Sequence, residues 1–98
     1  MCGILALIDT PWQQDCRQAL ATLHSRGPDD QDILQLPGVA LGHARLAVID
    51  VTGGKQPMQT PDGRYAIVFN GEIYNFQSLR DELTARGHVF ATHSDTEA

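Results

Sequence analysis

The sequence has few of the features that mark membrane, nucleic-acid-binding or secreted proteins. No apolar run approaches the roughly 20 residues that a membrane-spanning helix requires. The 7 Lys and Arg residues are scattered and are outnumbered by 12 Asp and Glu residues, which argues against nucleic acid or anionic lipid as a partner. The start of the chain, MCGILALID, lacks the positive region and the cleavage site of a signal peptide. We therefore expect a cytoplasmic protein with no membrane and no nucleic-acid partner.

Metal and disulfide chemistry have equally little support. Cys2 and Cys16 could form one disulfide, but reduced thiols are the expected state in the cytoplasm. The 4 histidines, among them His43, lack the His and Cys spacing that is typical of zinc sites. Gly53-Gly54-Lys55 is too short for a phosphate-binding P-loop. We predict no metal site in this segment.

The position of Cys2 is the most informative feature that the sequence does contain. Removal of Met1 would leave a thiol and a free α-amine on one residue. A terminal amine is a known base for a nucleophile of this kind, because it can accept the thiol proton near neutral pH. With Met1 attached, the same nitrogen is an amide and cannot act as a base. The alternative is that Cys2 is an apolar residue at the start of a strand.

Apolar periodicity predicts a strand, a helix and a hairpin in the first half of the chain. The apolar run over residues 3–8 favours a buried strand. Pro11 suits the first turn of a helix that ends at Gly27-Pro28, and Pro37-Gly38 joins strands over 33–36 and 39–46. The core-facing stripe of the helix is Trp12, Cys16, Ala19, Leu20 and Leu23. Cys16 is therefore assigned to packing.

The second half predicts a strand over 65–69 and a helix over 76–86. Asn75 is a suitable N-cap for that helix and Gly87 a suitable stop. Its inner face is predicted to carry Phe76, Leu79 and Leu83. Residues 94–97, Ser-Asp-Thr-Glu, have the form of a capping box, which begins another helix. Because the chain stops at Ala98, we expect residues 1–98 to be part of a larger domain.

Asn70-Gly71 allows two interpretations. An Asn-Gly pair after an apolar strand is a common hairpin turn. Alternatively, the Asn amide and the Gly N–H can converge on one point and stabilise the oxyanion of an acyl-transfer intermediate. The residues by themselves do not decide between the two.

The charged residues near apolar segments could have either a structural or a ligand-binding role. Arg45 lies within an apolar stretch and needs a partner, because an unpaired buried charge is costly. Asp50 or Glu72 could pair with it, or it could bind a ligand carboxylate in two-point fashion. Asp29, Asp30 and Asp95 are acidic turn residues of a kind that usually caps or solvates a turn.

Taken together, these segments resemble the class II glutamine amidotransferases, and in particular their asparagine synthetase branch. The order of the motifs along the chain carries the resemblance, which runs over the whole sequence. The motifs are MCGI at 1–4, RGPDD at 26–30, HARLAVID at 43–50, QP at 56–57, NGEIYN at 70–75 and SDTE at 94–97.

The resemblance implies a role for each matching residue. Cys2 would be the nucleophile, with its own α-amine as the base. Asn70 and Gly71 would form the oxyanion hole. The residues implied to bind the substrate L-glutamine are Arg45 at its α-carboxylate, the backbone of Val48 and Ile49 along the pocket, and Glu72 and Asp95 at its α-ammonium. The segment 26–30 would shape the wall near the nucleophile.

The resemblance also implies an architecture larger than this chain. The fold class would be α+β of the N-terminal-nucleophile hydrolase type, in which antiparallel sheets are sandwiched by helices. Residues 1–98 would be the N-terminal part of the glutaminase domain. The rest of that domain, and a C-terminal synthetase domain that uses ATP and Mg, would lie outside it. No cofactor is implied for this segment, and its exposed strand edges favour self-association. The alternative function is a non-catalytic glutamine-binding or interaction module, inactive because it is truncated or retains Met1.

Overall fold

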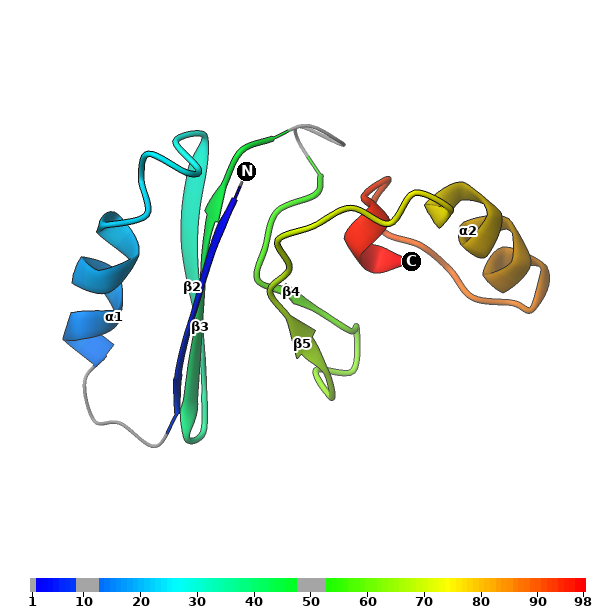
Figure 1. Ribbon diagram of the computed structural model, residues 1–98. Helices are drawn as coiled ribbons and strands as arrows, with labels where there is room; N and C mark the ends of the chain where they lie inside the picture. Colours follow the sequence, from blue (N-terminus) through cyan, green and yellow to red (C-terminus); the bar gives the residue numbers. More distant parts are fainter. Residues whose placement is uncertain (1, 9–12, 48–52) are drawn as a thin grey trace.

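The computed structural model describes residues 2–8, 13–47 and 53–98, which form a small α+β structure with two antiparallel sheets. Figure 1 shows helix α1 on one side of the larger sheet and the smaller sheet, with the segments that follow it, on the other side. The elements in chain order are β1 (Gly3–Ile8), α1 (Gln13–Ala21), β2 (Asp30–Leu36), β3 (Val39–Arg45), β4 (Met58–Gln59), β5 (Ala66–Ile67), α2 (Phe76–Ala85) and the 3₁₀ helix η1 (Asp95–Glu97).

The larger sheet has the strand order β1-β3-β2, and both pairings are antiparallel. The predicted strand over 3–8 is confirmed as β1, and the predicted hairpin is confirmed as β2 and β3. β2 begins at Asp30, earlier than the predicted 33, because Asp30 pairs with Arg45 at the far end of the hairpin. This register places the end of β3 beside the start of β1, where Gly3 pairs with Ala44.

α1 covers one face of this sheet through Cys16 and Leu20, which are 0% and 2% exposed. A Cβ placed on Gly42 of β3 would lie 3.3 Å from Leu20 Cδ1, so the helix packs closely on the middle strand. The packing assignment of Cys16 is confirmed. Burial raises the pKa of its thiol, against a smaller opposing effect of Arg17, and this keeps the thiol protonated.

The opposite face of β1 is more exposed than the sequence predicts. Side chains alternate along a strand, so Ile4 and Ile8 point away from α1. They are 48% and 72% exposed. The expectation of a fully buried strand is therefore wrong for β1, since within the described residues α1 covers only one of its faces.

The chain leaves α1 earlier than predicted. The helix ends at Ala21, and residues 22–26 form turns in which N–H groups bond to carbonyls three residues back. Gly27 then passes against β3. A Cβ at this position would lie 2.1 Å from both the carbonyl carbon and the oxygen of Ala44, so only glycine fits. The close approach lets Asp29 N donate to Arg45 O at 3.0 Å.

The smaller sheet is shorter than the sequence predicts. The expected strand over 65–69 is reduced to the two residues of β5, which pair with β4. The Asn70-Gly71 hairpin is wrong, because no residue of the described segment 68–75 lies in a strand. The physical reason lies at Phe69, whose N–H and C=O bond to buried side chains instead of to a partner strand.

α2 agrees with the predicted helix over 76–86 to within one residue, and Phe76, Leu79 and Leu83 are half-buried. Asn75 occupies the N-cap position, but its side chain makes no capping hydrogen bond within the described part of the chain. Gly87 has φ +93, the left-handed conformation expected of a helix stop.

The predicted capping box is only half formed. Ser94 accepts a hydrogen bond from Thr96 N at the start of η1. The Glu97 side chain does not accept a hydrogen bond from the backbone N–H of Ser94, as a full capping box requires. Instead its carboxylate accepts from Ala91 N and Thr92 N, each at 2.7 Å, and from the Thr92 hydroxyl. The acid therefore holds the loop that precedes η1, while Ser94 N donates to the Thr92 hydroxyl oxygen at 3.2 Å.

Candidate active site

A cavity of about 490 Å³ lies between the end of the larger sheet and the loops that follow β5 and precede η1. This volume is in the range of small-molecule sites. The predicted site residues that line it are Cys2, Arg45, Asn70, Gly71, Glu72 and Asp95. They come from segments far apart in the chain, and the structure brings them to one place.

Cys2 lies at the entrance of β1, beside the end of β3. Its thiol is near the backbone of Leu46: Sγ accepts from Leu46 N at 3.3 Å and donates to Leu46 O at 3.6 Å. Arg26 Nε donates to the Cys2 carbonyl at 3.2 Å. The backbone of Cys2 is therefore anchored while its half-buried thiol faces the cavity.

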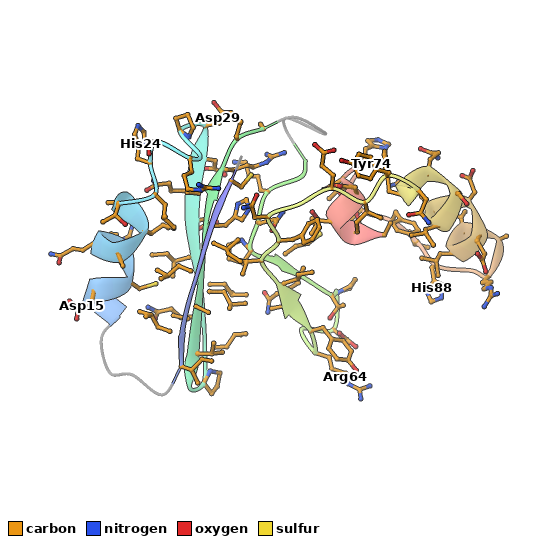
Figure 2. The ribbon with its side chains drawn as sticks, in the orientation of Figure 1. Asp15, His24, Asp29, Arg64, Tyr74 and His88 are labelled. Atoms are coloured by element: carbon orange, nitrogen blue, oxygen red, sulfur yellow. The ribbon has the colours of Figure 1, made fainter. Side chains whose placement is uncertain are left out.

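The segment 26–30 contacts the backbone beside Cys2 and at the end of β3. Asp29 Oδ2 accepts a hydrogen bond from Ala47 N at 2.8 Å, in the turn that leaves β3. Together with the Arg26 bond to Cys2, this contact fixes two neighbouring backbone segments. Residues 26–30 are not among the described residues that line the cavity, so their predicted wall-forming role stays a prediction. Asp29 corrects the expectation of an acid that merely solvates its turn. Figure 2 shows Asp29 beside this end of the sheet.

Arg45 and His43 are adjacent on the same face of β3 and are 5% and 1% exposed. Both line the cavity, so the guanidinium supplies positive charge to its wall. Asp50, one of the two predicted partners of Arg45, lies outside the described residues. Val48 and Ile49, predicted to line the pocket, and Met1 also lie outside them.

The acidic residues enter the cavity from the other half of the chain. Asp95 is 7% exposed at the start of η1, and its Oδ2 accepts from Ile73 N at 2.9 Å. Glu72, directly before Ile73, is exposed. Two acids and one guanidinium around one cavity suit a ligand that carries both an ammonium and a carboxylate. Asp95 is thus more than the solvated turn residue that its local sequence suggests.

Asn70 and Gly71 lie in the irregular segment that crosses the cavity. A Cβ on Gly71 would lie 2.8 Å from Phe69 Cζ, so a side chain here would collide with the ring of Phe69. Tyr74, 89% exposed, lies beside η1 at the edge of this region (Figure 2). Asn70 and Gly71 therefore line the cavity from a segment that is not a strand-connecting hairpin turn.

His43 was considered in the sequence only as a metal ligand, and its contact with the site was missed. Its Nε2 lies 3.2 Å from Phe69 O. Burial lowers the pKa of His43; the Phe69 carbonyl and Asp30 oppose this effect, and Arg45 adds to it. Gln56, 7% exposed, is a second missed residue. Its only sequence signal is the Gln56-Pro57 pair, which carries no chemistry of its own.

Within residues 2–8, 13–47 and 53–98, no three His, Cys, Asp or Glu side chains gather closely enough to hold a metal ion. None of the helices that the structure describes is long and apolar enough to span a membrane.

Comparison with known proteins identifies the family. The glutamine amidotransferase domain family matches residues 1–98. The chain belongs to this family. It is 47% identical to asparagine synthetase [glutamine-hydrolyzing] 3 of Bacillus subtilis (strain 168), over 99% of its own length and 17% of that protein. It is 41% identical to asparagine synthetase [glutamine-hydrolyzing] 2 of Arabidopsis thaliana and 40% identical to a probable asparagine synthetase of Dictyostelium discoideum. These two matches cover 99% of this chain and 17% and 18% of those proteins. The chain thus spans about a sixth of the length of these relatives.

Proposed function

We propose that the protein to which these residues belong, once Met1 is removed, hydrolyses L-glutamine to glutamate and ammonia through a glutamyl thioester on Cys2. The supporting observation is that Cys2, Arg45, Asn70, Gly71, Glu72 and Asp95 line one cavity. A cation, two acids and two neutral donors around one thiol match the carboxylate, the ammonium and the reacting amide of glutamine.

In the proposed reaction the α-amine of Cys2 takes the thiol proton, and the thiolate attacks the side-chain amide carbon of glutamine. The Asn70 amide and the Gly71 N–H hold the oxyanion of the tetrahedral intermediate. The C–N bond then breaks, and the leaving amine takes the proton back and departs as ammonia. Water attacks the thioester, releasing glutamate and restoring the thiol.

Arg45 binds the α-carboxylate in this scheme, and Glu72 and Asp95 bind the α-ammonium. The backbone of Val48 and Ile49 completes the pocket. Arg45 is suited to its role because a guanidinium can donate two parallel hydrogen bonds to one carboxylate. Its burial also strengthens that interaction relative to one in water.

We further propose that the ammonia serves an ATP-dependent amidation, with aspartate as acceptor and asparagine as product. The names of the relatives support this, as does the small share of their length that the chain covers. In that proposal the rest of an N-terminal-nucleophile sandwich and a synthetase domain that binds ATP and Mg lie outside residues 1–98. The exposed Ile4 and Ile8 support self-association of a chain of this length, since apolar patches favour association.

The decisive experiment uses the longest natural form of the protein and 6-diazo-5-oxo-L-norleucine, a reactive glutamine analogue. Intact mass is expected to show loss of Met1 and one adduct. Cys2→Ala is expected to carry no adduct and to lose glutamine-dependent synthesis, while synthesis from free ammonia survives. Cys16→Ala is the matched control and keeps the adduct, because Cys16 lies in the core beneath α1.

A retained Met1, or a processed chain that stays unlabelled, would contradict the proposal. Either outcome would favour the alternative, a glutamine-binding or interaction module without catalysis. That module would still bind glutamine through Arg45 and Asp95, which equilibrium binding measurements on Arg45→Ala and Asp95→Ala would detect.

A further inference from the structure

The backbone of Phe69 is held on both sides by buried side chains. Its N–H donates to Gln56 Oε1 at 2.6 Å, and its carbonyl lies 3.2 Å from His43 Nε2. Gln56 and His43 are 7% and 1% exposed, so water competes little for these bonds. Phe69 directly precedes Asn70 and Gly71, whose donors must point at one place for the proposed chemistry.

The bond to the Phe69 carbonyl defines the protonation of His43. A carbonyl only accepts, so Nε2 must carry the proton and donate it. The lowered pKa of the buried ring agrees with a neutral imidazole. Nδ1 is then an unprotonated acceptor, and it has no hydrogen-bond partner among the described residues. Leaving a buried polar atom unsatisfied costs free energy, which the bond from Nε2 to the Phe69 carbonyl partly offsets.

Gln56 also connects the Phe69 backbone to the 3₁₀ helix that carries Asp95. Its Nε2 donates to Thr96 Oγ1 at 3.1 Å, in the 3₁₀ helix η1 that also carries Asp95. Asp95 in turn accepts from Ile73 N at 2.9 Å. The segment 69–73 is therefore held at its first residue by Gln56 and His43 and at its last by Asp95.

We propose that Gln56 and His43 are positioning residues that clamp the Phe69 backbone and so orient the donors of Asn70 and Gly71. This proposal rests on the proposed function for the role of those donors, but the clamp itself is a separate claim about the loop. Donors fixed in advance stabilise a developing oxyanion better than mobile ones, because no reorganisation is needed during the reaction. A displacement of about 1 Å in such a group can cost about a hundredfold in rate.

The test compares two variants of Gln56. Gln56→Met removes both hydrogen bonds but keeps a side chain of similar length. Gln56→Glu keeps one acceptor for Phe69 N and another for the Thr96 hydroxyl. His43→Leu and His43→Gln form the second pair, since a Gln amide can donate to the Phe69 carbonyl as Nε2 does. All are made in the longest natural form of the protein. The readouts are glutaminase kcat, the rate of Cys2 alkylation by iodoacetamide, and amide hydrogen exchange over residues 69–73.

Gln56→Met and His43→Leu are expected to lower kcat by about ten- to a hundredfold. Alkylation should stay within about twofold of the natural protein, because that displacement forms no oxyanion. Exchange over 69–73 should speed up while the β1–β3 sheet is unchanged. Gln56→Glu and His43→Gln should recover most of the lost kcat. A purely structural role would instead slow alkylation as much as turnover and would speed up exchange in the sheet.

Unchanged exchange over 69–73 in both Gln56→Met and His43→Leu would overturn the clamp. Equal losses of kcat and alkylation would also overturn it. The exchange measurement does not depend on activity, so it separates the two proposals. If the natural protein hydrolyses no glutamine, the proposed function fails, while faster exchange in the variants still supports the clamp.

Discussion

The three-stranded sheet and the segment 53–98 contribute to one cavity, but they are held together differently. The sheet rests on continuous main-chain pairing between strands of six and seven residues, with α1 packed on one face. Apart from α2, the segment 53–98 has two-residue strands and relies on side chains that bond to backbone groups. Gln56, Asp95 and Glu97 each accept at least one backbone N–H there.

Because of this difference, the two regions hold their site residues in different ways. Cys2 and Arg45 are carried by the sheet, whose position is set by many weak, cooperative contacts. Asn70, Gly71 and Asp95 depend on a few buried polar bonds. Damage to the core beneath α1 should therefore reduce global stability, whereas damage to one polar contact in 53–98 should alter the site first.

The largest expected effect comes from Leu20→Ala, which opens a cavity beneath α1. We expect a loss of about 2–4 kcal/mol in the free energy of unfolding, because Leu20 is 2% exposed and contacts the middle strand. Urea unfolding followed by circular dichroism measures it. Val89→Ala is the control, since Val89 is 93% exposed, and it should change the stability by less than about 0.5 kcal/mol. Equal losses in both variants would refute the assigned core.

A smaller and more local effect is expected from Glu97→Gln. The amide cannot accept at both ends, so one of the donors at Ala91 and Thr92 loses its partner, at a cost of about 0.5–1.5 kcal/mol. Hydrogen exchange should speed up around 91–95, and KM for glutamine should rise because Asp95 follows this loop.

The matched control for that variant is Glu82→Gln. Glu82 forms an exposed ion pair with Arg86 at 2.8 Å on α2, which contributes less than about 1 kcal/mol. It should leave both KM and the exchange at 91–95 unchanged. If the two variants behave alike, Glu97 does not hold the loop.

The smallest expected effect is a dependence of stability on mildly acidic pH. Burial lowers the pKa of His43 in the fold, so below about pH 6.5 the unfolded chain binds the proton more readily than the folded one. Stability should therefore fall as the pH drops from about 6.5 towards the lowered pKa. Urea midpoints between pH 7.5 and 5 measure this slope. His43→Gln should flatten it in that window, and a slope unchanged by the substitution would mean that other groups carry it.

The carboxylate of Glu97 affects stability in a separate, more acidic pH range. Burial tends to raise the pKa of Glu97, but hydrogen bonds from Thr92 and Ala91 and the charge of Arg80 lower it overall. Its contribution to stability is present above about pH 4.5 and is lost below it. The two groups can thus be distinguished by pH.

Local sequence signals predicted the longer helices and strands. The turn residues Pro37-Gly38 between apolar segments and the helical spacing of 76–86 agree with the β2–β3 hairpin and with α2, although β2 begins three residues before the predicted strand. Prediction failed around 65–75, where β propensity and an Asn-Gly pair favoured a hairpin. There the backbone of Phe69 found partners in Gln56 and His43, which are 13 and 26 residues away in the chain. Local patterns cannot register such distant bonds.

The sequence by itself determined the residue types of the site, because a cysteine after Met1, an arginine in an apolar strand and the NGEIYN and SDTE segments are read directly from the chain. Only the tertiary structure decided that Asn70-Gly71 is an open loop and that Asp95 is buried at the cavity. It also decided that Gln56 and His43 meet at one peptide unit. The physical reason is that chemistry belongs to individual side chains, whereas orientation depends on which buried polar groups find each other once the chain has folded.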